Sequence, residues 1–172
     1  MLANLFLHYA FDAWMAREFP SIRFERYVDD AVVHCVSRAR GEYVARAIGD
    51  RMGQVGLELH PTKTRIVYCK DDSRGGVHQH TAFTFLGFTF RARGASIFTS
   101  FMPAVSKEAL NKMSARVRSW RLHRRTGHSL AQLAALINPI ITGWMRYCGA
   151  FYRSALYGLF SRINAYLLLG LG

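Results

Sequence analysis

Residues 24–33 have the sequence FERYVDDAVV, in which two adjacent aspartates, Asp29 and Asp30, stand between apolar and β-branched side chains. This pattern on both sides of a short polar stretch predicts a β-hairpin with the carboxylates at its turn. Chain folding gives no reason to place two like charges side by side, so we expect a cation there, and hard ions such as Mg²⁺ prefer carboxylate oxygen. For an isolated aspartate pair the plainer interpretation is a turn, because the Asp side chain caps local backbone groups.

The hairpin lies in a region where helical and strand-like patterns alternate. Apolar residues at helical spacing predict a helix over residues 2–19, ended by Pro20, and another over residues 42–55, closed by Gly56. Apolar and β-branched runs predict further strands over residues 64–69, 83–90 and 95–101.

The last third of the chain has helical patterns only. Ser106 is a good N-cap, and Ser129 with Gln132 three residues later fits a capping box. Asn138-Pro139 predicts a new helix start, because a proline in the first turn loses no hydrogen bond. A final helix is predicted over residues 154–169, and polar residues interrupt it, so it is not a membrane span.

The charge of the chain indicates a polyanionic partner. There are 23 Lys and Arg against 11 Asp and Glu, a formal net charge of +12, which suits nucleic acid. The excess is uneven, because residues 1–100 carry +3 and residues 101–172 carry +9. This change in composition predicts a domain boundary near Met102-Pro103.

Five segments, taken in order, resemble the reverse transcriptase/maturase proteins that group II introns encode. Residues 24–30 are similar to that family's polymerase active-site hairpin, and FLGF at residues 85–88 is similar to its primer-supporting hairpin. The other three are the helix over residues 2–12, GLELHPTKTR over residues 56–65, and Ile137-Asn138-Pro139 with Gly143-Trp144. The resemblance covers almost the whole chain.

The resemblance implies an α+β fold in two domains. Residues 1–102 are expected to form a partial reverse transcriptase palm, an antiparallel sheet with packed helices. Residues 103–172 are expected to form an all-helical thumb and maturase domain, similar to domain X. The fingers, the Gln-Gly motif and the first of the family's three catalytic aspartates have no counterpart in the sequence, so we interpret the chain as a fragment.

The implied function is RNA-directed DNA synthesis by nucleotidyl transfer, with a maturase role in intron splicing and mobility. In the intact site, Asp29, assisted by Asp30, would hold two Mg²⁺ ions together with the upstream aspartate. The other predicted site residues are Tyr27 and Val28 at the primer and nucleotide, Gly87 at the primer backbone, and Lys63 at the pyrophosphate. Lys63 fits a plain surface lysine equally well, and the isolated fragment is expected to be inactive.

The alternative function is that of a non-catalytic, RNA-binding maturase fragment. Few acidic residues are present to pair with the basic residues of the second half, although a solvated helix face is the plainer interpretation of a basic run. The residues predicted to contact RNA are Lys107, Lys112, Arg116, Arg118, Arg121, Arg124, Arg125, Arg146 and Arg153.

The expected partners are intron RNA, an RNA template with a DNA primer, and deoxynucleoside triphosphates, with no membrane. An incomplete palm would expose a sheet edge, so we expect either a homodimer or a complementing upstream fragment. Three cysteines, Cys35, Cys69 and Cys148, stand in apolar surroundings without paired spacing. They predict reduced core residues in a cytosolic protein. The expected location is the cytoplasm of a bacterium.

Overall fold

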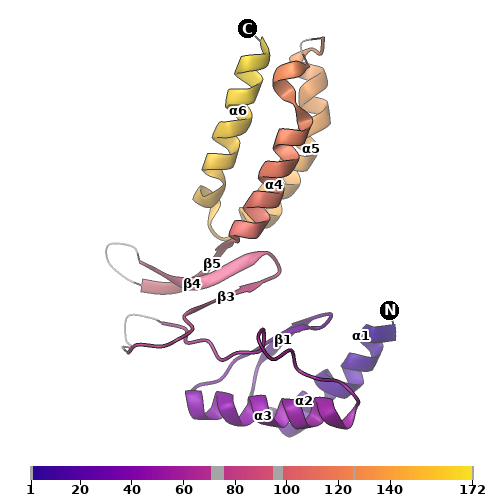
Figure 1. The fold of residues 1–172 in the computed structure, drawn as a ribbon, viewed down its shortest axis with the longest axis vertical. Helices are drawn as coiled ribbons and strands as arrows, with labels where there is room; N and C mark the ends of the chain where they lie inside the picture. The colour runs from indigo at the N-terminus through magenta and orange to yellow at the C-terminus, as the bar shows by residue number, and fades with distance from the viewer. Residues whose placement is uncertain (1, 71–75, 95–98, 126, 172) are drawn as a thin grey trace. The chain divides into compact units, whose positions relative to one another are not determined.

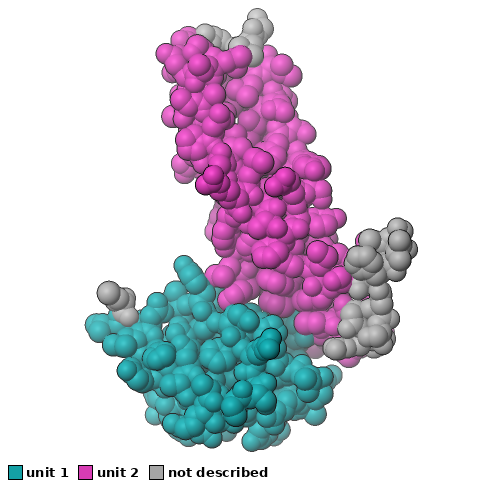
Figure 2. Space-filling model, turned by 180° about the vertical axis from the view of Figure 1, so that it is seen from behind, with its two compact units in different colours: residues 1–67 teal, residues 68–172 magenta. Residues whose placement is uncertain are grey.

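The computed structural model describes residues 2–70, 76–94, 99–125 and 127–171, which belong to two compact units. Unit 1 spans residues 1–67 and unit 2 spans residues 68–172 (Figure 2). Each unit combines helices with a small antiparallel sheet, so the expected mixed helix and sheet composition of an α+β fold is confirmed.

Unit 1 contains one N-terminal helical stretch, a two-stranded hairpin and one long helix (Figure 1). Its elements are α1 (Leu2–Leu7), the π-helical turn η1 (His8–Asp12), α2 (Ala13–Glu18), β1 (Phe24–Tyr27), β2 (Asp30–Val33) and α3 (Arg38–Gln54). The predicted hairpin and both predicted helices are confirmed, whereas the π-helical turn was not expected. α3 begins earlier than predicted because the Ser37 hydroxyl accepts a hydrogen bond from the Arg40 N–H at 3.2 Å.

The core of unit 1 joins the N-terminal helical stretch to α3 and to one face of the hairpin. Met15 and Val44 are fully buried at its centre. Phe24 of β1 meets Phe11 edge-to-face with ring centroids 5.3 Å apart. The hairpin is therefore fixed to the helices through its apolar face, which leaves its turn in solvent.

Unit 2 begins with a three-stranded antiparallel sheet in the order β3-β4-β5. The strands are β3 (Ala82–Phe85), β4 (Phe88–Gly94) and β5 (Thr99–Val105), and residues 95–98 of the predicted last strand lie outside the described residues. The strand predicted over residues 64–69 is wrong, since this segment has no regular secondary structure. The Tyr68 N–H does donate to the His80 carbonyl at 2.8 Å, but the segment does not form a strand.

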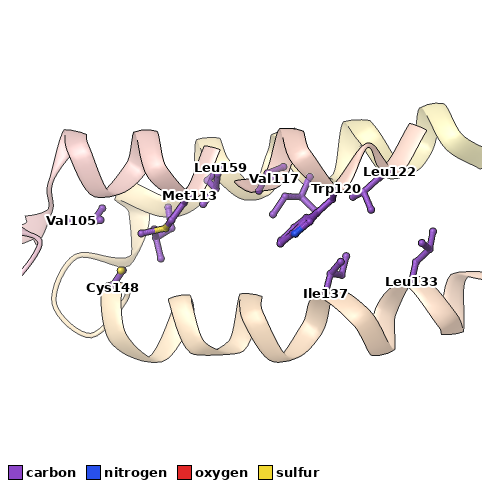
Figure 3. Close-up of a cluster of buried hydrophobic side chains, with 11 residues drawn as sticks. Val105, Met113, Val117, Trp120, Leu122, Leu133, Ile137, Cys148 and Leu159 are labelled. Carbon is purple, nitrogen blue, oxygen red and sulfur yellow. The ribbon is translucent and has the colours of Figure 1, made fainter. Parts of the chain in front are cut away.

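The rest of unit 2 is a bundle of three helices that lie side by side (Figure 1). Its elements are α4 (Lys107–Trp120), the short helix η2 (Leu122–Arg124), α5 (Leu130–Cys148), the short helix η3 (Arg153–Leu156) and α6 (Tyr157–Leu171). Apolar side chains from all three long helices fill the space between them (Figure 3). In this core, Trp120 stacks on Trp144 with ring centroids 5.7 Å apart, so the Gly143-Trp144 motif contributes to packing.

The predicted caps of the bundle are confirmed. The buried Ser106 hydroxyl accepts from the Ala109 N–H at 3.1 Å and begins α4. At the start of α5 both bonds of the capping box form, from Ser129 N–H to Gln132 Oε1 at 2.9 Å and from Gln132 N–H to Ser129 Oγ at 3.3 Å.

The predicted helix start at Asn138-Pro139 is wrong, because α5 runs through Pro139 without a break. Pro139 cannot donate to the carbonyl four residues earlier, which ordinarily destabilises a helix. The helix continues because Leu133, Ile137 and Cys148 are buried on its inner side, while Pro139 is exposed on the outer side.

The cysteine prediction holds in part. Cys148 is buried and Cys35 half-buried, and burial raises the pKa of both thiols. Cys69 is exposed, so its assignment to the core is wrong. Among the described residues, no helix is long and apolar enough to cross a membrane.

Replacing Pro139 by alanine is expected to stabilise unit 2 by about 1–2 kcal/mol, because alanine restores an N–H donor and its helix propensity is higher. The unfolding midpoint in urea measures this effect. Asn138→Ala, at the neighbouring exposed position, is the control and should shift stability by less than about 0.5 kcal/mol. A lower midpoint for Pro139→Ala would show that α5 requires the proline.

Candidate active site and nucleic-acid surface

The aspartate pair sits at a tight turn whose backbone is strained. Tyr27 pairs with Asp30 across the hairpin, so Val28 and Asp29 form a two-residue loop. Val28 has a φ of 57°, which is the sign pattern of a type II′ turn, where glycine is the usual first residue. A β-branched residue in the left-handed region is a backbone outlier, and such outliers persist only where surrounding contacts hold them.

The guanidinium of Arg26 supplies those contacts. Its Nη1 donates to the Val28 carbonyl at 2.6 Å, within the turn itself. Its Nε and Nη2 donate to the two carboxylate oxygens of Asp12, each at 2.7 Å, and Nη1 also reaches Asn4 Oδ1 at 3.3 Å. One side chain therefore ties the turn to the N-terminal helical stretch.

The pair between Arg26 and Asp12 is shielded from solvent. The two side chains are 12% and 23% exposed, and the geometry is bidentate, which is the strongest form of this interaction. Hydrogen bonding from Arg26 holds the pKa of Asp12 below its ordinary value of 3.8, against the opposing effect of burial. The sequence prediction missed both residues, although an arginine within the first strand of the hairpin was a visible signal.

The predicted site residues of the hairpin all face solvent. Asp29 and Asp30 are exposed, as are Tyr27 and Val28, which are 60% and 41% exposed. An open hollow of about 560 Å³ lies beside them, lined by Asn4, Leu5, His8, Arg26, Tyr27 and Val28. Neither aspartate lines this hollow, so the carboxylates and the hollow are neighbouring features of one surface.

Aspartate is a suitable type of ligand for Mg²⁺, but the turn offers only two such side chains. Carboxylate oxygens are the ligands that Mg²⁺ prefers, and the ion is commonly held by one or two of them together with substrate phosphates. Across the described ranges, no group of three or more His, Cys, Asp or Glu could hold a metal. The hairpin could therefore hold an ion only with help from other ligands.

Lys63 stands apart from the aspartates in its contacts. It is exposed on a turn over residues 61–63 of the same unit. None of the hydrogen bonds or ion pairs found among the described residues links Lys63 to the hairpin. Its predicted role stays a prediction.

Gly87 occupies a second tight turn, between β3 and β4 of unit 2. Leu86 and Gly87 have φ values of 50° and 79°, the sign pattern of a type I′ turn, which favours glycine. A Cβ at Gly87 would meet only the Ala109 Cβ at 4.0 Å, so the backbone angle and not crowding within the chain explains the glycine. The Tyr147 hydroxyl of α5 donates to the Leu86 carbonyl at 2.8 Å, and the Ser106 N–H donates to the Gly87 carbonyl at 2.8 Å.

The basic surface of the bundle is exposed and forms no ion pair with any of the residues that the structure describes. Eight of the nine residues predicted to contact RNA are exposed, and the ninth, Arg125, is half-buried with its Nε donating to the Trp120 carbonyl at 3.0 Å. Every ion pair found among the described residues lies in unit 1. The positive charge of the bundle is therefore available to an external anion.

Two family models match the chain, one over the part that contains the hairpin and one over the helical bundle. The model for reverse transcriptase (RNA-dependent DNA polymerase) matches residues 1–90, more than half of the chain. The model for the group II intron, maturase-specific domain matches residues 110–169, which is most of the helical bundle. No curated protein sequence matches the chain.

Replacing Arg26 by glutamine is expected to destabilise unit 1 by about 1–3 kcal/mol, because Asp12 and the Val28 carbonyl lose a charged donor. Since the pKa of Asp12 is lower in the folded chain, the pair stabilises fully above pH about 4 and this contribution is lost as the pH falls through the folded-state pKa. The variant lacks this pair, so its free energy of unfolding should fall less than that of the unsubstituted chain as the pH is lowered through this acidic range. Urea unfolding at several pH values measures both effects.

The matched control is Arg23→Gln, which removes an exposed arginine from the same segment. It should shift stability by less than about 0.5 kcal/mol at each pH. Equal effects of the two substitutions would contradict the role given to Arg26.

Proposed function

Because this chain belongs to the group II intron reverse transcriptase/maturase family, we propose that its hairpin takes part in RNA-directed DNA synthesis and that its bundle binds intron RNA. The observation that carries the proposal is the turn at Val28 and Asp29. A strained backbone, held by a shielded arginine, presents two adjacent carboxylates to solvent. Strain held in this manner is typical of functional sites.

Within this proposal Asp29 would be the principal metal ligand, and Asp30 would assist it or order the turn. A further aspartate would complete the protein ligands of two Mg²⁺ ions. These ions would supply charge stabilisation for in-line nucleotidyl transfer from a deoxynucleoside triphosphate. Tyr27 and Val28 lie beside the aspartates and would contact the primer end and the incoming nucleotide. Lys63 would neutralise the pyrophosphate.

The proposed domain assignment gives residues 1–102 to the palm and residues 103–172 to the thumb and maturase region. In this assignment the turn at Gly87, where Leu86 is exposed and Gly87 half-buried, would contact the primer backbone. The two compact units divide at residue 67, so the sheet β3-β4-β5 packs in one unit with the bundle. A palm sheet that is joined to the thumb would let both act on the same primer end.

Primer extension on an RNA template tests the catalytic proposal. The chain, joined behind the fingers and first palm strand of a reverse transcriptase of this family, is expected to extend a primer in Mg²⁺. Asp29→Asn should lower the rate by about 100-fold or more, because a lost metal ligand removes transition-state stabilisation. Asp50→Asn, at an exposed aspartate of α3, is the control and should leave the rate unchanged. A folded fusion that extends no primer would contradict the proposal.

The second candidate function is RNA binding without catalysis, as a maturase fragment. The bundle favours it, because its arginines and lysines are exposed and none of them is ion-paired within the described ranges. Phosphate and 2′-hydroxyl contacts dominate recognition of duplex RNA, since side chains cannot enter the deep, narrow major groove of an A-form helix.

Binding of a structured intron RNA should weaken steeply with salt, by at least about 100-fold between 50 mM and 200 mM, because bound counterions are released. Arg116→Gln on α4 is expected to lower the slope of log K against log salt by about 0.7–0.9. Arg38→Gln, whose arginine pairs with Glu42 at 2.8 Å, should leave the slope unchanged. Fluorescence anisotropy measures the slopes, and an affinity that hardly varies with salt would argue against this function.

A further inference from the structure

A small hollow lies where α4 ends and η2 packs against α6. It has a volume of about 280 Å³ and is lined by Arg118, Arg121, His123, Arg124 and Tyr166. Sites that bind drug-sized molecules usually have volumes of about 300 Å³ or more. The volume of this hollow is slightly smaller and suits a group of about the size of one nucleotide. All its lining residues belong to unit 2.

The hollow is strongly cationic. Three of its five lining residues are arginines, and among the described residues none of these arginines forms an ion pair. Glu108 is the only acidic residue of the sequence after residue 72, and it stands at the opposite end of α4, about 20 Å along the helix axis. That separation exceeds the screening length of about 8 Å at physiological ionic strength. The guanidinium groups are therefore free to bind a phosphate in the forked geometry that arginine favours.

Backbone strain marks the same place. Arg121 is the C-cap of α4 and has φ 48° and ψ 45°, in the left-handed region where helix ends usually carry glycine. This conformation turns the chain into η2, where Leu122 is buried in the bundle core while Arg121, His123 and Arg124 stay exposed. An arginine kept where glycine fits best points to a function for its side chain.

Two aromatic rings complete the hollow. His123 and Tyr166 lie with ring centroids 5.9 Å apart and planes inclined by 48°. Tyr166 is half-buried, which limits the movement of its ring, and His123 is exposed. Flat rings beside arginines are the usual platform on which proteins stack unpaired bases.

We infer that this hollow binds one unpaired nucleotide of an RNA, with the base on the Tyr166 and His123 rings and its phosphate among Arg118, Arg121 and Arg124. The inference rests on the RNA binding proposed for the bundle and adds a preference for unpaired nucleotides. A duplex held through its phosphates alone would need the arginines but not the rings.

The test compares three RNA hairpins by fluorescence anisotropy with the full chain. The first is blunt, the second has a three-nucleotide 3′ overhang, and the third has the same overhang without bases. The abasic overhang carries the same phosphates, so the difference between the second and third hairpins measures base stacking. We expect the overhang with bases to bind about 5- to 100-fold more tightly than the abasic one.

Tyr166→Leu should bring the affinity for the overhang down to that for the abasic hairpin and leave the blunt hairpin unaffected. Tyr157→Leu is the control, because Tyr157 is on the same helix, is 59% exposed and is not part of the hollow. Arg121→Gly should weaken binding of the overhang without lowering the thermal midpoint, since glycine adopts the left-handed conformation freely. This second variant separates binding from folding.

Equal affinities for the overhang and abasic hairpins would overturn the inference while leaving phosphate binding intact. If the folded, unsubstituted chain bound none of the three hairpins, that result would overturn the proposed RNA binding itself. Adenosine monophosphate should compete only at concentrations far above those of the RNA, because one nucleotide lacks the contacts made by the rest of the bundle. Competition at equal concentrations would mean a site for free nucleotides and would also overturn the inference.

Discussion

Left-handed backbone at three residues other than glycine is the constraint on which the proposed functional surfaces of this chain depend. Within the described ranges these residues are Val28, Leu86 and Arg121. Each stands where the chain reverses or leaves a helix, and each is held by a contact that another residue makes. Val28 is held by Arg26, Leu86 by the Tyr147 hydroxyl, and Arg121 by the burial of Leu122 beside it. Each such residue lowers the free energy of unfolding by about 1–3 kcal/mol, and packing around it offsets this strain. The result is an exposed turn with a fixed conformation.

Local patterns predicted much of this structure because they act within a few residues. The hairpin around Asp29 follows from β-branched runs, and the capping box at Ser129 follows from a spacing of three residues. Contacts between distant segments leave no such pattern. The pair between Arg26 and Asp12 joins residues 14 apart, and its partners could be identified only once the helix and the hairpin were placed in space. The aspartates themselves were predicted, but what holds their turn was not.

Pro139 shows how a correct local rule can give a wrong boundary. Proline is common in the first turn of a helix, so Asn138-Pro139 indicated a start. Nine residues earlier, Ser129 and Gln132 already begin α5, and the buried Leu133 and Ile137 favour one continuous helix. Packing over nineteen residues outweighs one missing hydrogen bond. Propensity rules describe an isolated segment. In the folded chain, packing in the bundle determines which of the two possible helix starts is used, Ser129 or Asn138-Pro139.

The hydrogen bond from the Tyr147 hydroxyl to the Leu86 carbonyl has a mechanical consequence. Phe88, next to the same turn, also packs on the rings of Tyr147 and Phe151 at centroid distances of 5.2 and 5.4 Å. The turn is thus fastened to the end of α5 by polar and apolar contacts at once. We therefore expect the Leu86–Gly87 turn to move together with the end of α5 when a macromolecule binds the bundle.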